Sequence, residues 1–406
     1  MAESPGMLSG RRMVLGVSGG IAAYKAVDVL RRLRELGAEV RVVMTRNATR
    51  FVAPLTFSAL SGSPVLADEF AEGTWGPMGH ISVTDGIDLA LVAPATANII
   101  GKAASGIADD ALSTALMAAA CPVIMAPAMN DRMFRNPILQ RNITALKSAG
   151  VRFVEPEEGV LACGTSGQGR LASLERIMQA AAAVLVPKDL AGVSVLVTAG
   201  PTREAIDAVR FISNPSSGKM GYALAAAARD RGAEVTLISG PTYLAPPEGV
   251  SHYTVTTAAE MSQTVREHAR RCRIIIMAAA VSDFRPKERS GTKIKKENVA
   301  PIITLERTDD ILQGLGAAKE DRILVGFAAE TENVVENARE KLLRKNLDLI
   351  VANDIAQPGA GFSSDTNAAV MIDRTGTVTD LPLGAKTELA FMIMDRVVEL
   401  KKNQGL

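Results

Sequence analysis

The sequence contains little of what marks a membrane-spanning, metal-binding or nucleic-acid-binding chain. Its 406 residues include only three cysteines, and these lack the paired spacing of zinc and dithiol sites: Cys121, Cys163 and Cys272. The most apolar stretch, residues 115–129, contains two prolines and is shorter than the ~20 residues of a membrane-spanning helix. Basic and acidic side chains balance at 45 to 44, which leaves no overall field to attract nucleic acid. The sequence therefore predicts a cytoplasmic protein with no membrane, zinc or nucleic-acid partner.

Short apolar runs, each followed by a loop and a helical pattern, recur along the chain. Residues 13–17 form such a run, apolar positions at helical spacing follow, and a second run occupies residues 40–44. The same order returns in the second half, with runs at residues 194–198 and 235–239 on either side of an alanine-rich helical segment at 219–231. This strand–loop–helix–strand order predicts parallel strands joined by right-handed crossovers.

The two halves are expected to be separate domains. A chain of 406 residues exceeds the ~250–300 residues at which a single core stops growing. We therefore expect two doubly wound α/β domains with mainly parallel sheets, residues 1–188 and 189–406. Further strands are expected at residues 89–92, 123–125, 274–277, 323–327 and 349–351.

A glycine-rich loop follows the first predicted strand. Its sequence, Gly16-Val17-Ser18-Gly19-Gly20, precedes a helix whose backbone N–H groups and dipole favour a bound phosphate. The spacing differs from the Gly-x-Gly-x-x-Gly of dinucleotide sites, and the next strand ends at Met44-Thr45 without an acidic residue. A tight turn explains the glycines equally well. Our preferred interpretation is a site for a mononucleotide phosphate.

Three single polar groups stand in apolar or glycine-rich sequence of the first half. His80 follows Met-Gly, Asn130 ends an apolar run where a strand should meet a loop, and Cys163 lies in the glycine-rich strip 162–170. Ligands of open α/β sheets bind at such strand ends, so the three groups can converge on one pocket. The strip, too flexible for regular structure, can close over a ligand. A core histidine, a loop-capping asparagine and a buried structural thiol remain the competing interpretations.

Residues 11–185 resemble the flavin-dependent cysteine decarboxylases, and the rest of the chain resembles the ligase that precedes them in coenzyme A synthesis. The whole chain is thus similar to the family of bacterial bifunctional phosphopantothenoylcysteine decarboxylases/phosphopantothenate–cysteine ligases. The resemblance implies a flavodoxin-like flavoprotein domain with FMN as cofactor, followed by a Rossmann-like ligase domain. Pro94 independently predicts that the strand at 89–92 ends before it. The residues implied to touch the flavin are Ser18, Gly19, Gly20, Thr45, Ser58, Pro94, Ala95, Thr96 and Asn98.

The same resemblance assigns a chemistry to the first half. It implies flavin-mediated oxidation of 4′-phosphopantothenoylcysteine, decarboxylation to an ene-thiolate, and re-reduction to 4′-phosphopantetheine. His80 is implied as the base, Asn130 as the carboxylate anchor, and Cys163 as the donor that protonates the ene-thiolate. The strip around Cys163 is implied to be a substrate lid.

The second half offers anion-binding groups near strand ends. Residues 213–221 open a helix with Ser, Asn and Gly, but the first and last positions break the Walker pattern Gly-x-x-x-x-Gly-Lys-Ser/Thr. Lys341 and Lys345 are spaced i, i+4 and can clamp a triphosphate from one helix face. Asp283 follows an apolar run and can hold a cation that bridges phosphates. A solvated lysine face and a capping aspartate are the alternatives.

The resemblance to the ligase family implies that this half uses CTP with Mg²⁺ to join 4′-phosphopantothenate to cysteine through an acyl-cytidylate. Asn214 is implied to stabilise that intermediate, Lys293 to neutralise phosphate charge, and Asp283 to hold the metal. Relatives often have Asn-Pro or Thr-Pro where this chain has Thr308-Asp309. A homo-oligomer, up to a dodecamer, is also implied. The implied nucleotide-binding residues are Ala278, Ala279, Ala280, Asp283, Lys293, Thr308, Asp309, Asp310, Ile311, Phe327, Lys341 and Lys345.

Two other functions compete with this interpretation. A flavoprotein that serves as a regulatory binding module suits the fold but not the joint presence of His80, Asn130 and Cys163. An NAD-dependent oxidoreductase suits two nucleotide-binding domains, because a fold alone does not fix a function. The missing Gly-x-Gly-x-x-Gly in both halves argues against the oxidoreductase.

Overall fold

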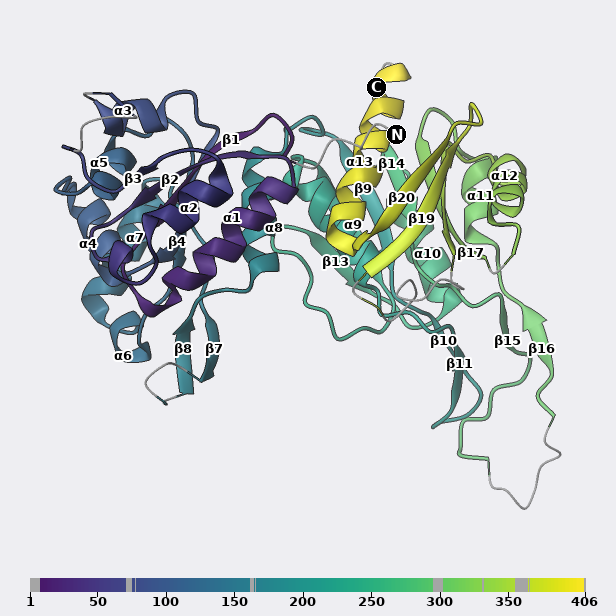
Figure 1. The fold of residues 1–406 in the computed structure, drawn as a ribbon. Helices are drawn as coiled ribbons and strands as arrows, with labels where there is room; N and C mark the ends of the chain where they lie inside the picture. Colours follow the sequence, from purple (N-terminus) through teal and green to yellow (C-terminus); the bar gives the residue numbers. More distant parts are fainter. Residues whose placement is uncertain are drawn as a thin grey trace. The chain divides into compact units, whose positions relative to one another are not determined.

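The computed structural model divides the chain into two compact units, Met1–Val186 and Pro187–Leu406. The residues that it describes are 8–70, 75–76, 78–160, 164, 166–294, 302–330, 332–354, 364 and 366–404. Each unit has its own central sheet with helices packed against it (Figure 1). Within the described ranges, no helix is both long and apolar enough to cross a bilayer. Each unit also buries an apolar core of its own.

A parallel sheet in the order β3-β2-β1-β4-β5-β6 forms the centre of the first unit. Without the two-residue edge strand β3, this is the flavodoxin order. A separate antiparallel hairpin pairs β7 with β8. The strands are β1 (Arg12–Val17), β2 (Glu39–Met44), β3 (Val65–Leu66), β4 (Leu89–Ala95), β5 (Val123–Pro127), β6 (Arg152–Phe153), β7 (Glu157–Val160) and β8 (Ser166–Arg170). The helices are η1 (Ile21–Lys25), α1 (Ala26–Glu35), η2 (Ala48–Arg50), α2 (Pro54–Ser61), α3 (Gly79–Thr84), α4 (Ala97–Ser105), α5 (Ala111–Ala118), α6 (Asp131–Phe134), α7 (Pro137–Ser148) and α8 (Leu174–Leu185).

Helices cover both faces of this sheet because alternate strand residues point to opposite sides. Leu15 of β1 packs in a core with α1 and α8, whereas Val14 packs in a second core with α4 and α7. The helices supply apolar residues at helical spacing, as Val29, Leu30 and Leu33 of α1 do. The carboxyl ends of β1, β2 and β4 are left at one edge of the sheet, where ligands of doubly wound folds bind.

Two predictions about this unit are wrong. The strand expected to end before Pro94 continues to Ala95, because β4 and β5 pair again at Ala95 and Pro127 after a register shift. The glycine-rich strip expected to lack regular structure contributes β8, which pairs with β7. Hydrogen bonds between the two backbones fix a conformation that the glycines alone would not keep.

The second unit is built on a sheet in the order β13-β12-β9-β14-β17-β18-β19-β20. The strands from β13 to β18 are parallel in the order typical of Rossmann folds, and β19 and β20 extend the sheet in antiparallel fashion. Helix α13 packs on α9. The strands are β9 (Ser194–Ala199), β10 (Arg203–Ala205), β11 (Phe211–Ser213), β12 (Glu234–Ser239), β13 (Ser251–Thr254), β14 (Ile274–Met277), β15 (Phe284–Pro286), β16 (Leu305–Arg307), β17 (Ile323–Glu330), β18 (Leu349–Asp354), β19 (Thr366–Asp373) and β20 (Val378–Ala385). The helices are α9 (Lys219–Asp230), α10 (Ala258–Ala269), α11 (Ile311–Ala317), α12 (Val334–Arg344) and α13 (Lys386–Asn403).

Both sheets confirm the predicted fold class of two doubly wound, mainly parallel-sheet domains. The strand predicted at 274–277 coincides with β14, whereas the one predicted at 323–327 extends to Glu330. The extension continues the parallel pairing of β17 with β18 as far as Glu330 and Asp354. Strand interiors were therefore predictable from apolar runs, but strand ends depend on the neighbouring strand.

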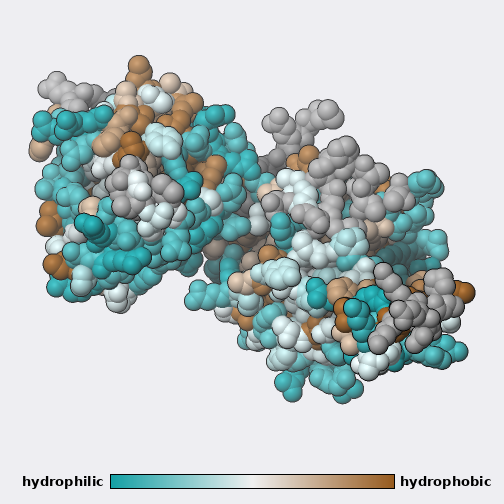
Figure 2. All heavy atoms as spheres, turned by 90° about the horizontal axis from the view of Figure 1, so that it is seen from below, coloured by the Kyte–Doolittle hydropathy of each residue, from teal (hydrophilic) through white to brown (hydrophobic). Residues whose placement is uncertain are grey.

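The surface of the first unit carries a patch of apolar residues, drawn in brown in Figure 2, whereas hydrophilic residues cover most of the remaining surface in that view. Among the exposed apolar side chains of this unit are Phe51, Leu55 and Phe70, which are 51%, 77% and 89% exposed. Apolar surface of this kind is typical of a protein–protein contact.

Candidate functional site

The carboxyl ends of β1 and β4 are joined by Ser18, the first residue after β1. Its buried hydroxyl donates to Pro94 O at 2.7 Å and accepts from Thr96 N at 2.9 Å. The strand order reverses between β1 and β4, and such switch points are where doubly wound sheets bind ligands. The structure therefore brings the predicted residues Ser18, Pro94, Ala95 and Thr96 together at the expected position.

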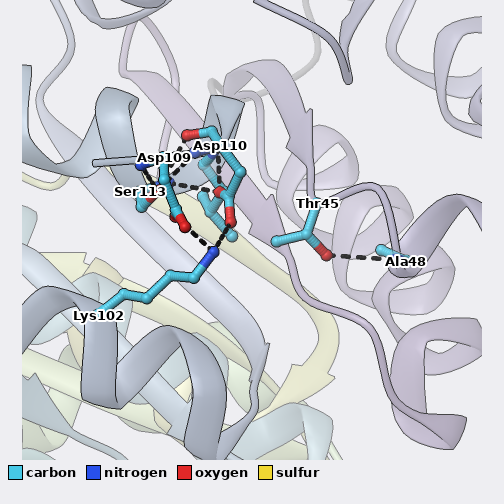
Figure 3. Close-up of polar contacts among 7 residues, drawn as sticks. Thr45, Ala48, Lys102, Asp109, Asp110 and Ser113 are labelled. Atoms are coloured by element: carbon cyan, nitrogen blue, oxygen red, sulfur yellow. Dashed lines mark hydrogen bonds and ion pairs between the residues drawn. The ribbon is translucent and has the colours of Figure 1, made fainter. Parts of the chain in front are cut away.

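The glycine loop packs closely against the backbone of the segment that follows β2. A Cβ added to Gly19 would lie 2.4 Å from Asn47 Cβ and 2.8 Å from Asn47 C. Gly20, which has no side chain to cap it, precedes η1. Thr45, the residue after β2, accepts from Ala48 N through Oγ1 at 3.2 Å, as Figure 3 shows. The loop thus offers backbone rather than bulky side chains, which fits a flavin phosphate.

Because the resemblance implies a flavin phosphate at this loop, Gly19→Ala is expected to weaken flavin binding. The added methyl group would overlap the backbone of Asn47, so the loop must move away from its present path. We expect flavin affinity to fall at least about tenfold, or about 1.4 kcal/mol, measured by fluorescence titration of the apoprotein. Gly101→Ala is the matched control, because its Cβ would have no neighbour closer than 3.9 Å. Unchanged flavin affinity in Gly19→Ala would contradict the placement of the phosphate.

A charged cluster connects α4 to α5 (Figure 3). Lys102 Nζ lies 2.6 Å from Asp109 Oδ1 and 2.5 Å from Asp110 Oδ2. Asp110 also caps α5, because its Oδ1 accepts from Leu112 N at 3.1 Å and from Ser113 N at 2.9 Å. Burial alone would raise the pKa of Asp110, but the hydrogen bonds from Lys102 and Ser113 outweigh it and hold that pKa below its ordinary value.

Asp110→Asn is expected to destabilise the first unit in a pH-dependent way. The pKa of Asp110 is lower in the folded state than its ordinary value of about 4. The charged carboxylate therefore stabilises the folded state fully at pH values above about 4, and this stabilisation is lost as the pH falls through the folded pKa. We expect about 1–3 kcal/mol less stability at pH 7 and a flatter acid dependence, measured by thermal unfolding across pH. Asp109→Asn, whose side chain is 60% exposed, should cost about 0.5 kcal/mol or less. Equal effects of the two variants would contradict the role given to the Asp110 charge beside Lys102, because asparagine can still cap α5.

Asn130 lies between the end of β5 and α6. Ala128 N donates to Ala95 O at 3.1 Å, so the segment before Asn130 runs beside the end of β4. The Asn130 side chain caps α6, because its Oδ1 accepts from Arg132 N at 2.9 Å. The capping role that the sequence left open is therefore present, and it fixes Asn130 at the strand-end edge of the sheet.

The β7–β8 hairpin packs directly on the segment that contains Asn130. Met129 N donates to Gly169 O at 2.9 Å, and Asp131 Oδ1 accepts from the backbone of β8 at 3.1 Å. A Cβ on Gly169 would lie only 2.2 Å from Met129 O, so this contact requires glycine. Cys163 belongs to the segment between β7 and β8 and lies outside the described residues. The stem of the predicted lid is thus seated beside the predicted carboxylate anchor.

His80, Ser58 and Asn98 lie on helices of the same unit. His80 is the second residue of α3 and is half-buried. Ser58 of α2 donates through its hydroxyl to Leu55 O at 3.1 Å and lines a surface hollow with Leu55 and Pro64. Asn98, near the start of α4, is exposed. Hydrogen bonds hold Ser18, Pro94 and Thr96 together at the strand ends. The positions of His80, Ser58 and Asn98 depend instead on how their helices pack.

A cavity of about 380 Å³ lies at the carboxyl ends of the parallel strands in the second unit. The start of α9, the residues after β14, and the ends of β17 and β18 form its walls. The strand order reverses between β9 and β14, so the cavity occupies a switch point. The predicted residues in its lining are Asn214, Ala278, Ala279, Ala280, Asp283, Phe327 and Lys341.

Asn214 binds the backbone that follows β14. Its Nδ2 donates to Val281 O at 3.1 Å and to Ala280 O at 3.4 Å. Ala280 N in turn donates to Gly200 O at 2.9 Å. This wall of the cavity is therefore fixed by hydrogen bonds from two different segments of the chain.

Lys341 and Lys345 have different partners. Lys341 lines the cavity, and its Nζ donates to Phe327 O at 3.3 Å. Burial, and after it the positive charge of Lys345, lowers the pKa of Lys341. Lys345 forms an ion pair with Asp310 at 2.7 Å, and Asp310 caps α11 through Gln313 N at 2.9 Å. Lys341 thus faces the cavity, whereas Lys345 holds a helix cap.

The turn that begins at Thr308 packs on the segment that carries Asp283. Thr308 N donates to Asp283 O at 3.0 Å, and Thr308 Oγ1 donates to Ser282 O at 2.6 Å. Within the described residues, no three His, Cys, Asp or Glu side chains are grouped to hold a metal. A single carboxylate at the cavity fits Mg²⁺ that is carried by nucleotide phosphates, since such ions use one or two protein carboxylates.

Lys293, Asp309 and Ile311 do not belong to the cavity lining of the described residues. Lys293 is exposed, Asp309 forms an ion pair with an exposed arginine at 3.0 Å, and Ile311 is part of the apolar core. The backbone next to Lys293 is held by Asp207, whose Oδ2 accepts from Ile294 N at 3.2 Å. Lys293 is therefore attached to an anchored segment outside the cavity wall.

Three residues that sequence reasoning missed also line the cavity: Asn353, Asn367 and Lys386. Asn367 Nδ2 donates to Asn353 Oδ1 at 2.9 Å, and Lys386 Nζ donates to Ser364 O at 2.7 Å. Asn353 lies near the end of β18, so the strand-end rule could have found it. Asn367 and Lys386 come from β19 and α13, and no local pattern in the sequence connects them to the cavity.

Comparisons with known proteins cover both units. A family model described as "Flavoprotein" matches residues 1–186, and one described as "DNA/pantothenate metabolism flavoprotein C-terminal domain" matches residues 190–400. The coenzyme A biosynthesis bifunctional protein CoaBC of Bacillus subtilis (strain 168) is 49% identical over 403 residues, 98% of this chain and 99% of that protein. The protein of the same name from Escherichia coli (strain K12) is 46% identical over 399 residues, 96% and 97% of the two chains. The crystal structure of the C-terminal domain of a CoaBC protein matches 53% of this chain and 99% of its own, at 44% identity and a TM-score of 0.47.

Proposed function

Since this chain belongs to the family of coenzyme A biosynthesis bifunctional proteins, we propose which of its residues carry out the two reactions. The chain is a flavoprotein enzyme with a decarboxylase and a ligase activity. We assign the decarboxylase to residues 1–188 and the ligase to residues 189–406. The product of the ligase is then the substrate of the decarboxylase on the same chain.

The proposed ligase joins 4′-phosphopantothenate to cysteine with CTP. The observation that supports it is the cavity at the carboxyl ends of the second sheet, whose lining includes Asn214, Asp283 and Lys341. Lys341 offers positive charge to the nucleotide phosphates from a half-buried position, where charges interact more strongly than in water. Asn214 stabilises the site of the acyl-cytidylate, because its Nδ2 holds the backbone of Ala280 and Val281 in the cavity wall. Asp283 holds Mg²⁺ together with the phosphates. Lys293 adds positive charge from its exposed segment.

The proposed decarboxylase binds FMN at the carboxyl ends of β1, β2 and β4. Bound FMN supplies a temporary hydride acceptor, which allows the substrate to lose CO₂. Gly19 lets the backbone approach the flavin phosphate, and Asn130 holds the substrate carboxylate. His80 acts as the base, and Cys163 protonates the ene-thiolate. The β7–β8 hairpin, whose stem packs on the Asn130 segment, carries Cys163 to the substrate.

We also propose that the chain is a cytoplasmic homo-oligomer. The exposed apolar side chains of the first unit, Phe51, Leu55 and Phe70 among them, support this proposal. Most oligomers of one chain are closed and symmetric, so these side chains would be buried against a second copy. Sedimentation of the purified protein measures the number of copies, and a monomer at micromolar concentration would contradict the proposal.

The function is tested by one incubation of the purified holoprotein with 4′-phosphopantothenate, cysteine, Mg²⁺ and either CTP or ATP, followed by mass spectrometry. We expect CMP and 4′-phosphopantetheine with CTP, and little product with ATP. Accumulation of 4′-phosphopantothenoylcysteine would support the ligase and contradict the roles given to His80, Asn130 and Cys163. No product with either nucleotide would favour the regulatory binding module.

A further inference from the structure

The six-residue helix α3, which carries His80, has little local support. A helix this short does not keep its shape in water by itself. Met78, which precedes it, contributes no side-chain cap. Thr84 Oγ1 donates to the carbonyls of His80 and Ile81, both at 3.0 Å, a pattern that weakens a helix rather than anchoring it. Contacts from other elements must therefore fix the position of His80.

Arg41, from the middle of β2, holds the C-terminal end of α3. Its Nη1 donates to Ser82 O at 2.9 Å, to Asp85 O at 3.1 Å and to Val83 O at 3.3 Å. The last carbonyls of a helix have no partners within the helix, and a positive charge there also matches the negative end of the helix dipole. The Arg41 side chain is only 15% exposed, and its bond to Val83 O is partly buried, whereas the bonds to Ser82 O and Asp85 O lie at the surface.

Arg41 also contacts the residue on which the start of α3 rests. Its guanidinium carbon lies 5.6 Å from the centroid of the Trp75 ring. Gly79, the first residue of α3, packs closely there, since an added Cβ would lie 3.3 Å from Trp75 Cβ and 3.2 Å from Leu66 Cδ1. Arg41 is thus in contact with the last turn of α3 and also with Trp75, against which the first residue of α3 packs.

We infer that Arg41 is a positioning residue for the decarboxylation step, because it fixes the helix that presents His80. The inference rests on the proposed role of His80 as the base. Proton transfer requires the base to lie within hydrogen-bond distance of the proton that it removes. A displacement of about 1 Å at such a group can cost about 100-fold in rate. Loss of the three bonds to the last turn of α3 leaves that turn without its anchor to the sheet.

Arg41→Met tests this inference in the full-length holoenzyme, because methionine keeps an unbranched apolar stem and removes the guanidinium donors. We expect kcat for decarboxylation of supplied 4′-phosphopantothenoylcysteine to fall about 10- to 100-fold with little change in KM. Amide hydrogen exchange in residues 78–85 should become faster, while the flavin absorbance and the CTP-dependent ligase activity stay unchanged. Arg41→Lys should retain more activity than Arg41→Met, because its ammonium group still donates to the carbonyls.

Two further variants make the test specific. Glu39→Gln removes the exposed carboxylate that lies 3.7 Å from Arg41 Nε but leaves the bonds to α3, and it should behave as the unsubstituted protein. Arg41→Met combined with His80→Asn should be no slower than His80→Asn alone, because the two act through one group. Normal kcat, unchanged hydrogen exchange, or loss of flavin in Arg41→Met would overturn the inference. Normal decarboxylation in His80→Asn would instead show that the proposed base is wrong.

Discussion

Asn214→Asp is expected to remove most of the ligase activity while leaving decarboxylation intact. In the protein, Asn214 Nδ2 donates to Val281 O at 3.1 Å and to Ala280 O at 3.4 Å. A carboxylate at this position would place negative oxygen against two carbonyl oxygens and would repel the phosphates of CTP. Disturbing preorganised polar groups around a charged transition state costs about 10²–10³ in kcat, so we expect a loss of about this size in CMP release once the cavity wall held by Asn214 is displaced.

The two activities of the chain provide the control for this variant. Decarboxylation of supplied 4′-phosphopantothenoylcysteine should proceed at the normal rate, because Asn214 belongs to the second unit. Asn214→Ala removes the donors without adding charge, so its ligase activity should lie between those of the aspartate variant and the unsubstituted protein. If Asn214→Asp kept more than half of the CMP release, the role given to this amide would be wrong.

His80→Asn is expected to slow decarboxylation by about 10²–10⁴, the usual range for losing a positioned general base. Asparagine keeps a hydrogen-bonding side chain of similar size but cannot accept the proton. The cradle formed by Ser18, Gly19 and Thr45 does not include His80, so the flavin absorbance should remain. The rate is measured as CO₂ release from 4′-phosphopantothenoylcysteine under saturating substrate.

Thr84→Val is the matched control on the same helix. It removes the hydroxyl that donates to the carbonyls of His80 and Ile81 and leaves the imidazole in place. Its kcat should stay within about threefold of normal, because back-bonding of this kind does not stabilise a helix. Equal losses in Thr84→Val and His80→Asn would show that α3 matters for folding rather than for proton transfer.

The fold could be predicted where its signal is local. The runs at 13–17 and 194–198 became β1 and β9 because a buried parallel strand needs a nearly continuous apolar stretch. The hairpin of β7 and β8 was missed, since its regular structure comes from pairing across the chain and from the fit of Gly169 against Met129 O. Two-residue strands such as β3 leave too few positions to show any periodicity.

The candidate site divides in the same way. Ser18 lies in the glycine loop after the first predicted strand, where the strand-end rule places ligands, whereas Thr45 and Asn214 were found through the resemblance to known families. Asn367 and Arg41 could not be found from the sequence, because their contacts with the cavity and with α3 come from packing rather than from their neighbours in the chain. Arg41 stands in an ordinary strand pattern, and only the three-dimensional structure shows its bonds to α3.

The hydrogen bonds of the Ser18 hydroxyl make the flavin cradle depend on the folding of the first unit. It bonds to Pro94 and Thr96, 76 and 78 residues further along the chain, so the flavin cradle is absent until β4 has docked beside β1. FMN therefore binds the folded unit and not the unfolded chain. By mass action, free FMN at a hundred times its Kd stabilises that unit by about 2.7 kcal/mol. At that concentration bound FMN lowers the population of unfolded chain about 100-fold, and proteolysis that requires the unfolded chain becomes slower by a similar factor.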